Sequence, residues 1–183
     1  MNEQDILNLI KEDEWMMKVL KIAEELNFPD WVIGAGFVRN KVWDYLHGFS
    51  NKKVDTNDID LVYFDPQGND KKTDKQLSQK LKEQTGIDWE VRNQFYMHEK
   101  NGVPPYKSTE DALSCWPETA TGLGVRLENN NLKLIAPNGI DDLVNLIIRP
   151  CPKFPDGLEK VKERAKKKAW FEKWPKLKFQ ENG

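Results

Sequence analysis

The fold prediction begins at Asn57-Asp58-Ile59-Asp60-Leu61-Val62, where two acidic residues open an apolar run typical of a buried strand. Side chains alternate along a strand, so Asp58 and Asp60 point the same way with Cα atoms about 6.6 Å apart. Two carboxylates this close repel each other unless a cation lies between them or one is protonated. A hard divalent ion such as Mg²⁺ suits all-oxygen ligands. The pair therefore predicts a metal site, and the alternative is a solvated acidic loop before the strand.

A second candidate site is the glycine turn, Gly34-Ala35-Gly36, between a predicted strand at 31–33 and a predicted helix at 37–46. Glycines let the backbone approach an anion closely, and a helix start offers free amides with a favourable dipole. Arg39 and Asn40, in the first helical turn, add a charged donor fork and a neutral donor. The turn therefore predicts phosphate binding, with a packing turn that binds nothing as the alternative.

The glycine turn departs from two common nucleotide-binding motifs. A dinucleotide-binding fingerprint has a third glycine where this chain has Arg39, and its acidic residue ends the second strand rather than preceding it. A P-loop requires Gly-Lys-Ser or Gly-Lys-Thr, and the sequence contains neither. The P-loop is therefore excluded, and a dinucleotide-binding turn is less favoured than a phosphate-binding turn of another kind.

Length and composition describe a globular protein with one domain over residues 1–183. The 28 Lys and Arg against 30 Asp and Glu give a net charge of −2, so no global field favours nucleic acid or a membrane surface. No apolar run approaches the ~20 residues of a membrane helix, and the acidic N-terminus lacks the features of a secretory signal. Two cysteines, Cys115 and Cys151, are typical of a reducing compartment. We expect a cytoplasmic protein without a membrane partner.

Periodicity and turn residues predict the other elements. Gly86 has the position of a helix C-cap, and residues 128–131 have the composition of a hairpin turn. Residues 51–57 form a polar connection. We expect helices at 14–26, 37–46, 74–84, 108–113, 140–147 and about 157–175, and strands at 31–33, 59–64, 89–92, 124–127 and 132–135.

The predicted C-terminal helix is strongly basic. Between Leu158 and Lys178 there are nine basic and three acidic residues, which is a local charge of +6. An apolar stripe that includes Val161 and Ala165 predicts a helix docked on the domain with a solvated basic side. The alternative is that this helix, with its two tryptophans, binds RNA or DNA.

In this order, the glycine turn and the Asp-x-Asp pair resemble the nucleotidyltransferase superfamily typified by DNA polymerase beta. Five segments are similar to a small bacterial branch of that superfamily: 34–40, 57–60, 89–94 with His98, 116–121 with Val125 and Arg126, and 136–143. The resemblance implies an α/β (α+β) fold with a mixed β-sheet flanked by helices. It also implies a core at about 28–150, with an N-terminal helix and a basic C-terminal helix outside it.

The resemblance further implies a third carboxylate on a neighbouring strand, at Glu90, with Asp88 as the fallback. Glu90 would complete the metal site or take a proton from the acceptor. The bound ion would be Mg²⁺ or Mn²⁺, held with Asp58 and Asp60. The implied nucleotide-binding residues are Gly34, Ala35, Gly36, Arg39 and Asn40, and the candidate substrate contacts are Arg92, Asn93, His98 and Arg126.

The implied reaction starts from a nucleoside triphosphate, such as ATP, whose α-phosphorus is attacked by an unidentified acceptor as pyrophosphate leaves. Two alternatives of other classes compete with this enzyme. One is a nucleic-acid-binding module that uses the basic C-terminal helix, although the net charge does not indicate nucleic acid as a partner. The other keeps the fold but not the catalysis, as a nucleotide-binding regulatory protein.

Overall fold

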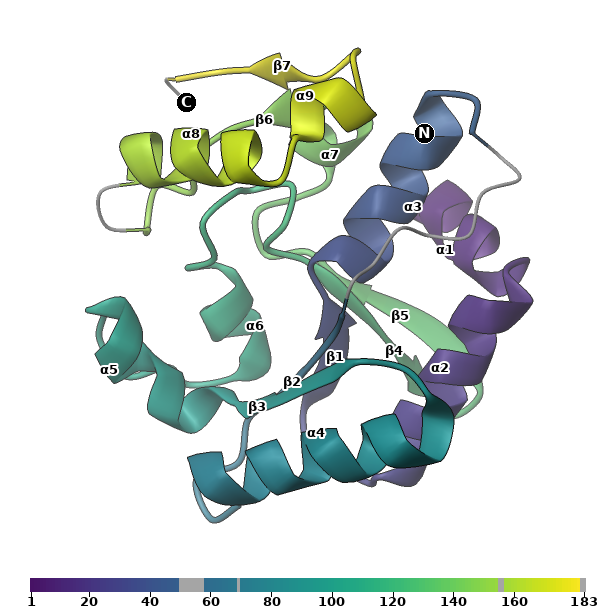
Figure 1. The fold of residues 1–183 in the computed structure, drawn as a ribbon, viewed down its shortest axis with the longest axis vertical. Helices are drawn as coiled ribbons and strands as arrows, with labels where there is room; N and C mark the ends of the chain where they lie inside the picture. Colours follow the sequence, from purple (N-terminus) through teal and green to yellow (C-terminus); the bar gives the residue numbers. More distant parts are fainter. Residues whose placement is uncertain (50–57, 69, 155–156, 182–183) are drawn as a thin grey trace.

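The computed structural model describes residues 1–49, 58–68, 70–154 and 157–181 (Figure 1). The predicted polar connection at 51–57, including Asn57, lies outside the described residues. In chain order the elements are α1 (Glu3–Lys11), α2 (Glu14–Glu25), β1 (Trp31–Gly34), α3 (Gly36–Leu46), β2 (Ile59–Tyr63), α4 (Lys71–Thr85), β3 (Trp89–Asn93), η1 (Gln94–Tyr96), α5 (Met97–Asn101), α6 (Thr109–Leu113), β4 (Gly124–Glu128), β5 (Asn131–Ile135), α7 (Asp141–Val144), β6 (Ile147–Ile148), α8 (Gly157–Lys167), α9 (Trp170–Lys173) and β7 (Lys178–Phe179). Within the described part, no helix combines the length and apolarity needed to cross a bilayer.

A mixed five-stranded sheet, in the order β3-β2-β1-β4-β5, forms the centre of the described structure. β1 pairs antiparallel with both β2 and β4, and β5 pairs antiparallel with β4. β2 and β3 are parallel, with α4 between them in sequence, because a parallel pair needs a crossover connection. In Figure 1, α4 lies at one end of the molecule and α8 and α9 lie at the other. The predicted α/β fold with a mixed sheet and flanking helices is confirmed.

Local chemistry explains where several elements end. α4 begins where the Asp70 side chain accepts a hydrogen bond from the Thr73 amide at 2.8 Å, and it ends at Gly86 in the left-handed region (φ 70°). The β4–β5 hairpin turns through Asn129 and Asn130, whose φ angles are 53° and 62°. A two-residue type I′ turn needs both central residues at positive φ, which asparagine tolerates. The sequence predicted the Gly86 cap and the hairpin turn, whereas it predicted that α4 begins at residue 74.

Strand β2 separates the core from the candidate site. Ile59, Leu61 and Tyr63 are fully buried, in a hydrophobic cluster that extends from α1 to the C-terminal elements. Because side chains alternate along a strand, Asp60 lies on the opposite face. A slip of one residue would put this carboxylate into the core and the apolar side chains outside, so core packing fixes the register of the acidic residues.

The helix predicted at about 157–175 is broken in two. α8 ends at Lys167, and Ala169 adopts a left-handed conformation with φ 51° before α9 begins. Trp170 and Trp174 then pack edge-on against Trp43 of α3, with ring centroids 5.6 Å and 5.1 Å away. A left-handed alanine costs roughly 1–2 kcal/mol. Burying each large apolar side chain contributes about as much or more, so tertiary packing outweighs local helix propensity.

Other differences from the predicted elements are local. The helix predicted at 140–147 is the shorter α7, because Leu146 turns to φ 59° and Ile147–Ile148 pairs as β6 with Lys178–Phe179 of β7. The sequence patterns also did not predict α1, η1 or α5. The β6–β7 pair ties the C-terminal segment (residues 157–181) to the chain that follows α7.

Trp174 is a test of this docking. It is 2% exposed, and its indole Nε1 donates to Asp44 Oδ1 at 2.7 Å. We expect Trp174→Ala to lower the free energy of unfolding by about 3–5 kcal/mol, because a large buried side chain is lost. The control Phe171→Ala, at a 40% exposed position in α9, should change it by less than about 0.5 kcal/mol. Equal losses in urea denaturation would contradict the docked arrangement.

Candidate active site

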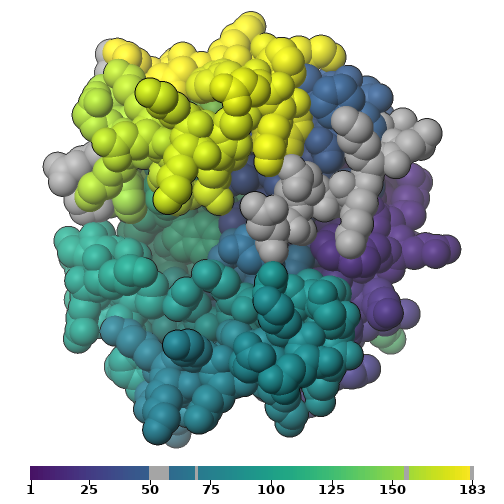
Figure 2. Space-filling model, viewed as in Figure 1, coloured from purple at the N-terminus to yellow at the C-terminus, as the bar shows by residue number. Residues whose placement is uncertain are grey.

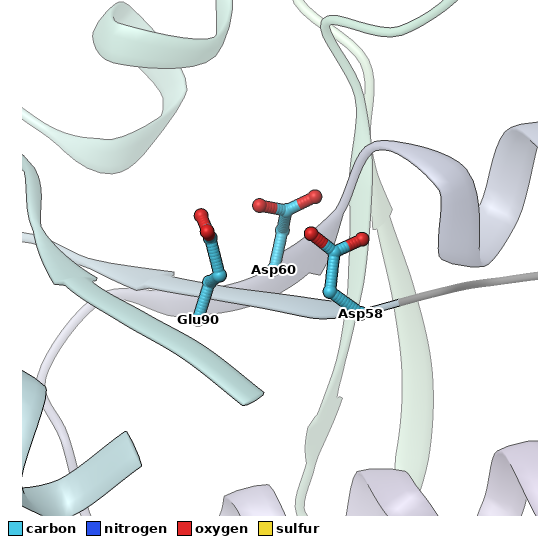
Figure 3. A group of neighbouring side chains, drawn as sticks. All are labelled: Asp58, Asp60 and Glu90. Carbon is cyan, nitrogen blue, oxygen red and sulfur yellow. The ribbon is translucent and has the colours of Figure 1, made fainter. Parts of the chain in front are cut away.

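Three carboxylates meet where β2 and β3 begin. Asp58 immediately precedes β2, and Asp60 within β2 is in register with Glu90 of the parallel strand β3. Each side chain offers one oxygen, and these atoms all lie within 4.8 Å of one another. The three side chains extend from the same side of the sheet (Figure 3). Asp58, Asp60 and Glu90 are called the acidic triad below.

The acidic triad concentrates negative charge in a partly buried place. Burial, followed by repulsion from Asp58 and Glu90, raises the pKa of Asp60 to about 7, while Lys168 and Arg39 act in the opposite direction. A divalent cation among the three carboxylates would relieve the repulsion. The all-oxygen donor set suits a hard ion such as Mg²⁺ or Mn²⁺. The residues present therefore fit the metal that the sequence predicts.

The structure distinguishes the two candidates for the third carboxylate. Asp88 forms an ion pair with Lys82 of α4 at 2.5 Å, and both side chains are about half exposed. Glu90 instead joins the two aspartates and accepts a hydrogen bond from Arg92 Nη2 at 3.1 Å. The arrangement therefore favours Glu90 over the fallback Asp88 as a metal ligand.

The glycine turn joins β1 to α3 in a conformation that favours glycine at its middle residue. Ala35 is the N-cap of α3 at φ 54° and ψ −125°, and no side chain caps the helix there. The neighbouring glycines are closely packed, since a Cβ on Gly34 would lie 3.0 Å from Trp116 and one on Gly36 would lie 3.3 Å from Asn40 Nδ2. Because Ala35 provides no side-chain cap, the first backbone amides of α3 are available to an anion, as at many helix N-termini that bind phosphate.

Arg39 is a buried cation, only 4% exposed. Its Nη1 donates to Thr121 Oγ1 at 2.7 Å, and its Nε and Nη2 donate to Asn40 Oδ1 at 3.2 Å and 3.0 Å. The guanidinium also lies 4.5 Å from the ring centroid of Trp170 and 5.1 Å from that of Trp43. Burial lowers the pKa of Arg39 to about 10, so it keeps its charge at neutral pH. Arg39 is thus a fixed positive charge behind the glycine turn.

The acidic triad and the glycine turn line the same cavity, whose volume is about 770 Å³. Small-molecule sites usually measure roughly 300–1,000 Å³, so a nucleotide fits this space. In Figure 2 the surface is hollowed between the yellow-green C-terminal segment and the teal part of the chain. The lining residues are Ala35, Gly36, Arg39, Asn40, Asp58, Asp60, Glu90, Arg164, Lys167, Lys168, Ala169, Trp170, Lys173 and Trp174.

The second wall of the cavity was not predicted. It contains four cationic residues of the C-terminal segment, Arg164, Lys167, Lys168 and Lys173, which are called the basic wall below. The sequence analysis assigned these residues to a solvated helix face or to a nucleic-acid surface. The high positive charge of this segment could have indicated an anion-binding surface. Nothing in the local sequence, however, indicates that this surface lies close to the glycine turn.

The chain between α6 and β4 connects the two walls. The Glu118 side chain is 2% exposed and accepts a hydrogen bond from Arg164 Nε at 2.7 Å, which fixes one member of the basic wall. Three residues later, Thr121 accepts the hydrogen bond from Arg39. The motif at 116–121 therefore contributes side chains that hold the cavity walls rather than side chains that line the cavity.

The predicted substrate contacts lie in different places. Among the described residues, only Arg92 of this group contacts the acidic triad, through Glu90. The side-chain amide of Asn93 donates to the backbone carbonyl of Asp65 at 2.7 Å. The His98 ring nitrogen Nδ1 lies 2.9 Å from the backbone carbonyl of Phe95. Arg126 forms an ion pair with Asp30 at 3.2 Å. These residues are not brought to the cavity lining, and their contact with substrate stays a prediction.

Comparison with known proteins gives the family. The sequence model of a family described as nucleotidyltransferase matches residues 21–179. The chain therefore belongs to the nucleotidyltransferase family and is a nucleotidyl-transferring enzyme. No curated protein matches it.

Solved structures give the same fold. An NMR structure described as revealing a CCA-adding enzyme head domain is 36% identical, with a TM-score of 0.86 over 99% of this chain and 97% of the other. The Thermotoga maritima CCA-adding enzyme complexed with tRNA is 18% identical, with a TM-score of 0.59 over 97% of this chain. A tRNA-processing enzyme complex is 21% identical, with a TM-score of 0.53 over 88% of this chain. This chain spans 42% and 43% of those two longer chains, which share its fold.

The raised pKa of Asp60 predicts how metal binding depends on pH. In the metal-free protein this pKa is about 7 instead of 3.8, so folding favours the protonated form of the carboxyl. Its contribution to the free energy of unfolding is complete below pH 3.8 and is lost as the pH rises through 7. Protons also compete with the metal for Asp60. We expect Mg²⁺ to raise the melting temperature more at pH 8 than at pH 6. The difference should vanish in Asp60→Asn; a Mg²⁺ effect independent of pH in the unmodified protein would contradict this assignment.

The conformation of Ala35 predicts a stabilising substitution. Backbone strain of this kind costs roughly 1–3 kcal/mol, whereas the added flexibility of glycine costs about 0.5–1 kcal/mol. Ala35→Gly should therefore raise the free energy of unfolding by about 1 kcal/mol in urea denaturation. Ala165→Gly, inside the regular helix α8, is the matched control and should lower it by about as much. Similar losses in both variants would show that Ala35 is unstrained.

Proposed function

We propose that this protein transfers a nucleoside monophosphate from a nucleoside triphosphate to an acceptor, using Mg²⁺ or Mn²⁺ at the acidic triad. The observation that carries the proposal is the meeting of three carboxylates and the uncapped start of α3 in one cavity of nucleotide size. Membership of the nucleotidyltransferase family supports the triphosphate as donor.

Asp58 and Asp60 are the proposed metal ligands from β2, and Glu90 is the third, from β3. Bound divalent ions would neutralise charge that develops on the attacking and leaving oxygens. Glu90 has an alternative role as the base that accepts a proton from the attacking group, because its side chain is 43% exposed and within reach of an acceptor in the cavity.

The glycine turn is the proposed anion site. The amides of Ala35 and Gly36 would donate to phosphate oxygens, and the dipole of α3 favours negative charge there. Arg39 would add a fixed positive charge from behind, and Asn40, on the cavity lining, a neutral donor. The acceptor would attack the α-phosphorus in line, so that a bond from the acceptor forms while the bond to pyrophosphate breaks.

The relatives suggest which acceptor to test first. The 36% identical structure is described as a CCA-adding enzyme head domain, and a more distant enzyme of the same fold is complexed with tRNA. We therefore propose tRNA as the first acceptor to assay, ahead of small-molecule and protein acceptors. A cytoplasmic location, as the sequence predicts, is consistent with that substrate.

Carboxylate variants test the proposed function. Pyrophosphate release from a mixture of the four nucleoside triphosphates with Mg²⁺ and tRNA should fall by more than about 100-fold in Asp58→Asn, Asp60→Asn and Glu90→Gln. This magnitude is expected because removing residues that only orient metal ligands already lowers metal affinity or activity by about 10–100-fold. Asp88→Asn is the matched control, two residues from Glu90 but paired with Lys82, and should keep nearly full activity.

Two results would contradict the proposal in different ways. Nucleotide binding without pyrophosphate release, across tRNA and a broad panel of other acceptors, would favour a regulatory protein. Steeply salt-dependent RNA binding that survives Asp58→Asn with Asp60→Asn, in a protein whose melting temperature no nucleotide changes, would favour a nucleic-acid-binding module.

A further inference from the structure

The basic wall faces the acidic triad across the cavity. Its residues come from the end of α8, the break between α8 and α9, and the end of α9. Lys168 and Asp60 both line this cavity, and these two described residues form no ion pair with each other. Opposite charges that share a cavity without touching leave space for something between them.

The basic wall is held in place by buried contacts on both sides of the break. Upstream, Arg164 is paired with the buried Glu118 at 2.7 Å. Downstream, Trp170 covers the Arg39 guanidinium and Trp174 donates to Asp44 at 2.7 Å. The lysines between these contacts therefore project from a fixed backbone, which lowers the entropy cost of binding a ligand.

Ion pairing differs among the basic residues of the C-terminal segment. In the part of the chain that the structure describes, neither Lys167 nor Lys168 has an ion-pair partner, whereas Lys162 and Arg164 of the same helix do. Adjacent Lys166 is different, because it lines a separate hollow with Phe171 and Phe179. Unpaired ammonium groups inside a cavity favour an anionic ligand, and lysine commonly binds phosphate as a point charge.

We propose that Lys167 and Lys168, aided by Lys173, form a subsite for the β- and γ-phosphates of the donor, opposite the metal ligands of the acidic triad. The inference rests on the proposed function. It assigns to the C-terminal segment the binding of the two phosphates that leave as pyrophosphate. The donor is favoured over the phosphates of an RNA acceptor because these lysines line the same cavity as the triad. A backbone-tracking site would instead need an extended basic groove.

Inorganic tripolyphosphate with Mg²⁺ is a probe that does not depend on base preference. Its affinity, measured by titration calorimetry on the full chain, should fall about tenfold or more in Lys167→Ala/Lys168→Ala, since charge-assisted contacts are lost. Lys166→Ala is the matched control from the same lysine run and should change the affinity less than twofold. Unchanged melting temperatures would establish that each variant is folded, and single Lys168→Ala gives a smaller change if the double variant is unstable.

Further binding measurements distinguish the phosphates of the donor from those of an RNA acceptor. Adenosine monophosphate has no β- or γ-phosphate, so its affinity should be equal in the double variant and the unmodified protein. Loss of affinity for a short single-stranded RNA, with tripolyphosphate binding intact, would overturn the subsite and assign the lysines to the acceptor. Full triphosphate binding and pyrophosphate release in the double variant would also overturn the subsite but leave the proposed function standing. Absence of triphosphate binding in the unmodified protein would defeat both.

Discussion

The register between the parallel strands β2 and β3 is the constraint on which the site depends. It sets Asp60 beside Glu90, while the alternation along β2 sets Asp58 on the same side as Asp60. The register is fixed from the other face, where Ile59 and Leu61 are fully buried. Hydrophobic packing thus holds three carboxyl groups together, and the repulsion between their charged forms is an unfavourable cost in the metal-free protein.

The rest of the cavity compensates for that charge. Arg39 supplies a buried cation from α3, and the C-terminal segment supplies an exposed basic wall. The two sources are physically joined, because Trp170 of α9 covers the Arg39 guanidinium at 4.5 Å. Two alanines in the left-handed half of φ space, Ala35 and Ala169, both line this cavity. Backbone strain commonly concentrates at functional sites, where surrounding packing maintains it.

Much of the fold could be predicted because its signals are local. Gly86 as a helix C-cap and the asparagines between β4 and β5 identify turns from a few residues each. The β6–β7 pair and the break at Ala169 could not be predicted, because each forms through contacts between distant segments. The regular spacing of Val161 and Ala165 continues a helical pattern without indicating that two tryptophans further on will pack on Trp43.

The sequence by itself determined that Asp58 and Asp60 share a face and that a glycine turn opens a helix, since both follow from the backbone geometry of neighbouring residues. It also supplied a family resemblance that named Glu90 with Asp88 as an alternative. Only the tertiary structure grouped the Glu90 side chain with the two aspartates while Asp88 pairs with Lys82, and only it brought Lys168 to the cavity that Asp60 lines. Such contacts depend on how separate elements pack, and side-chain spacing along one element carries no information about its distance from another.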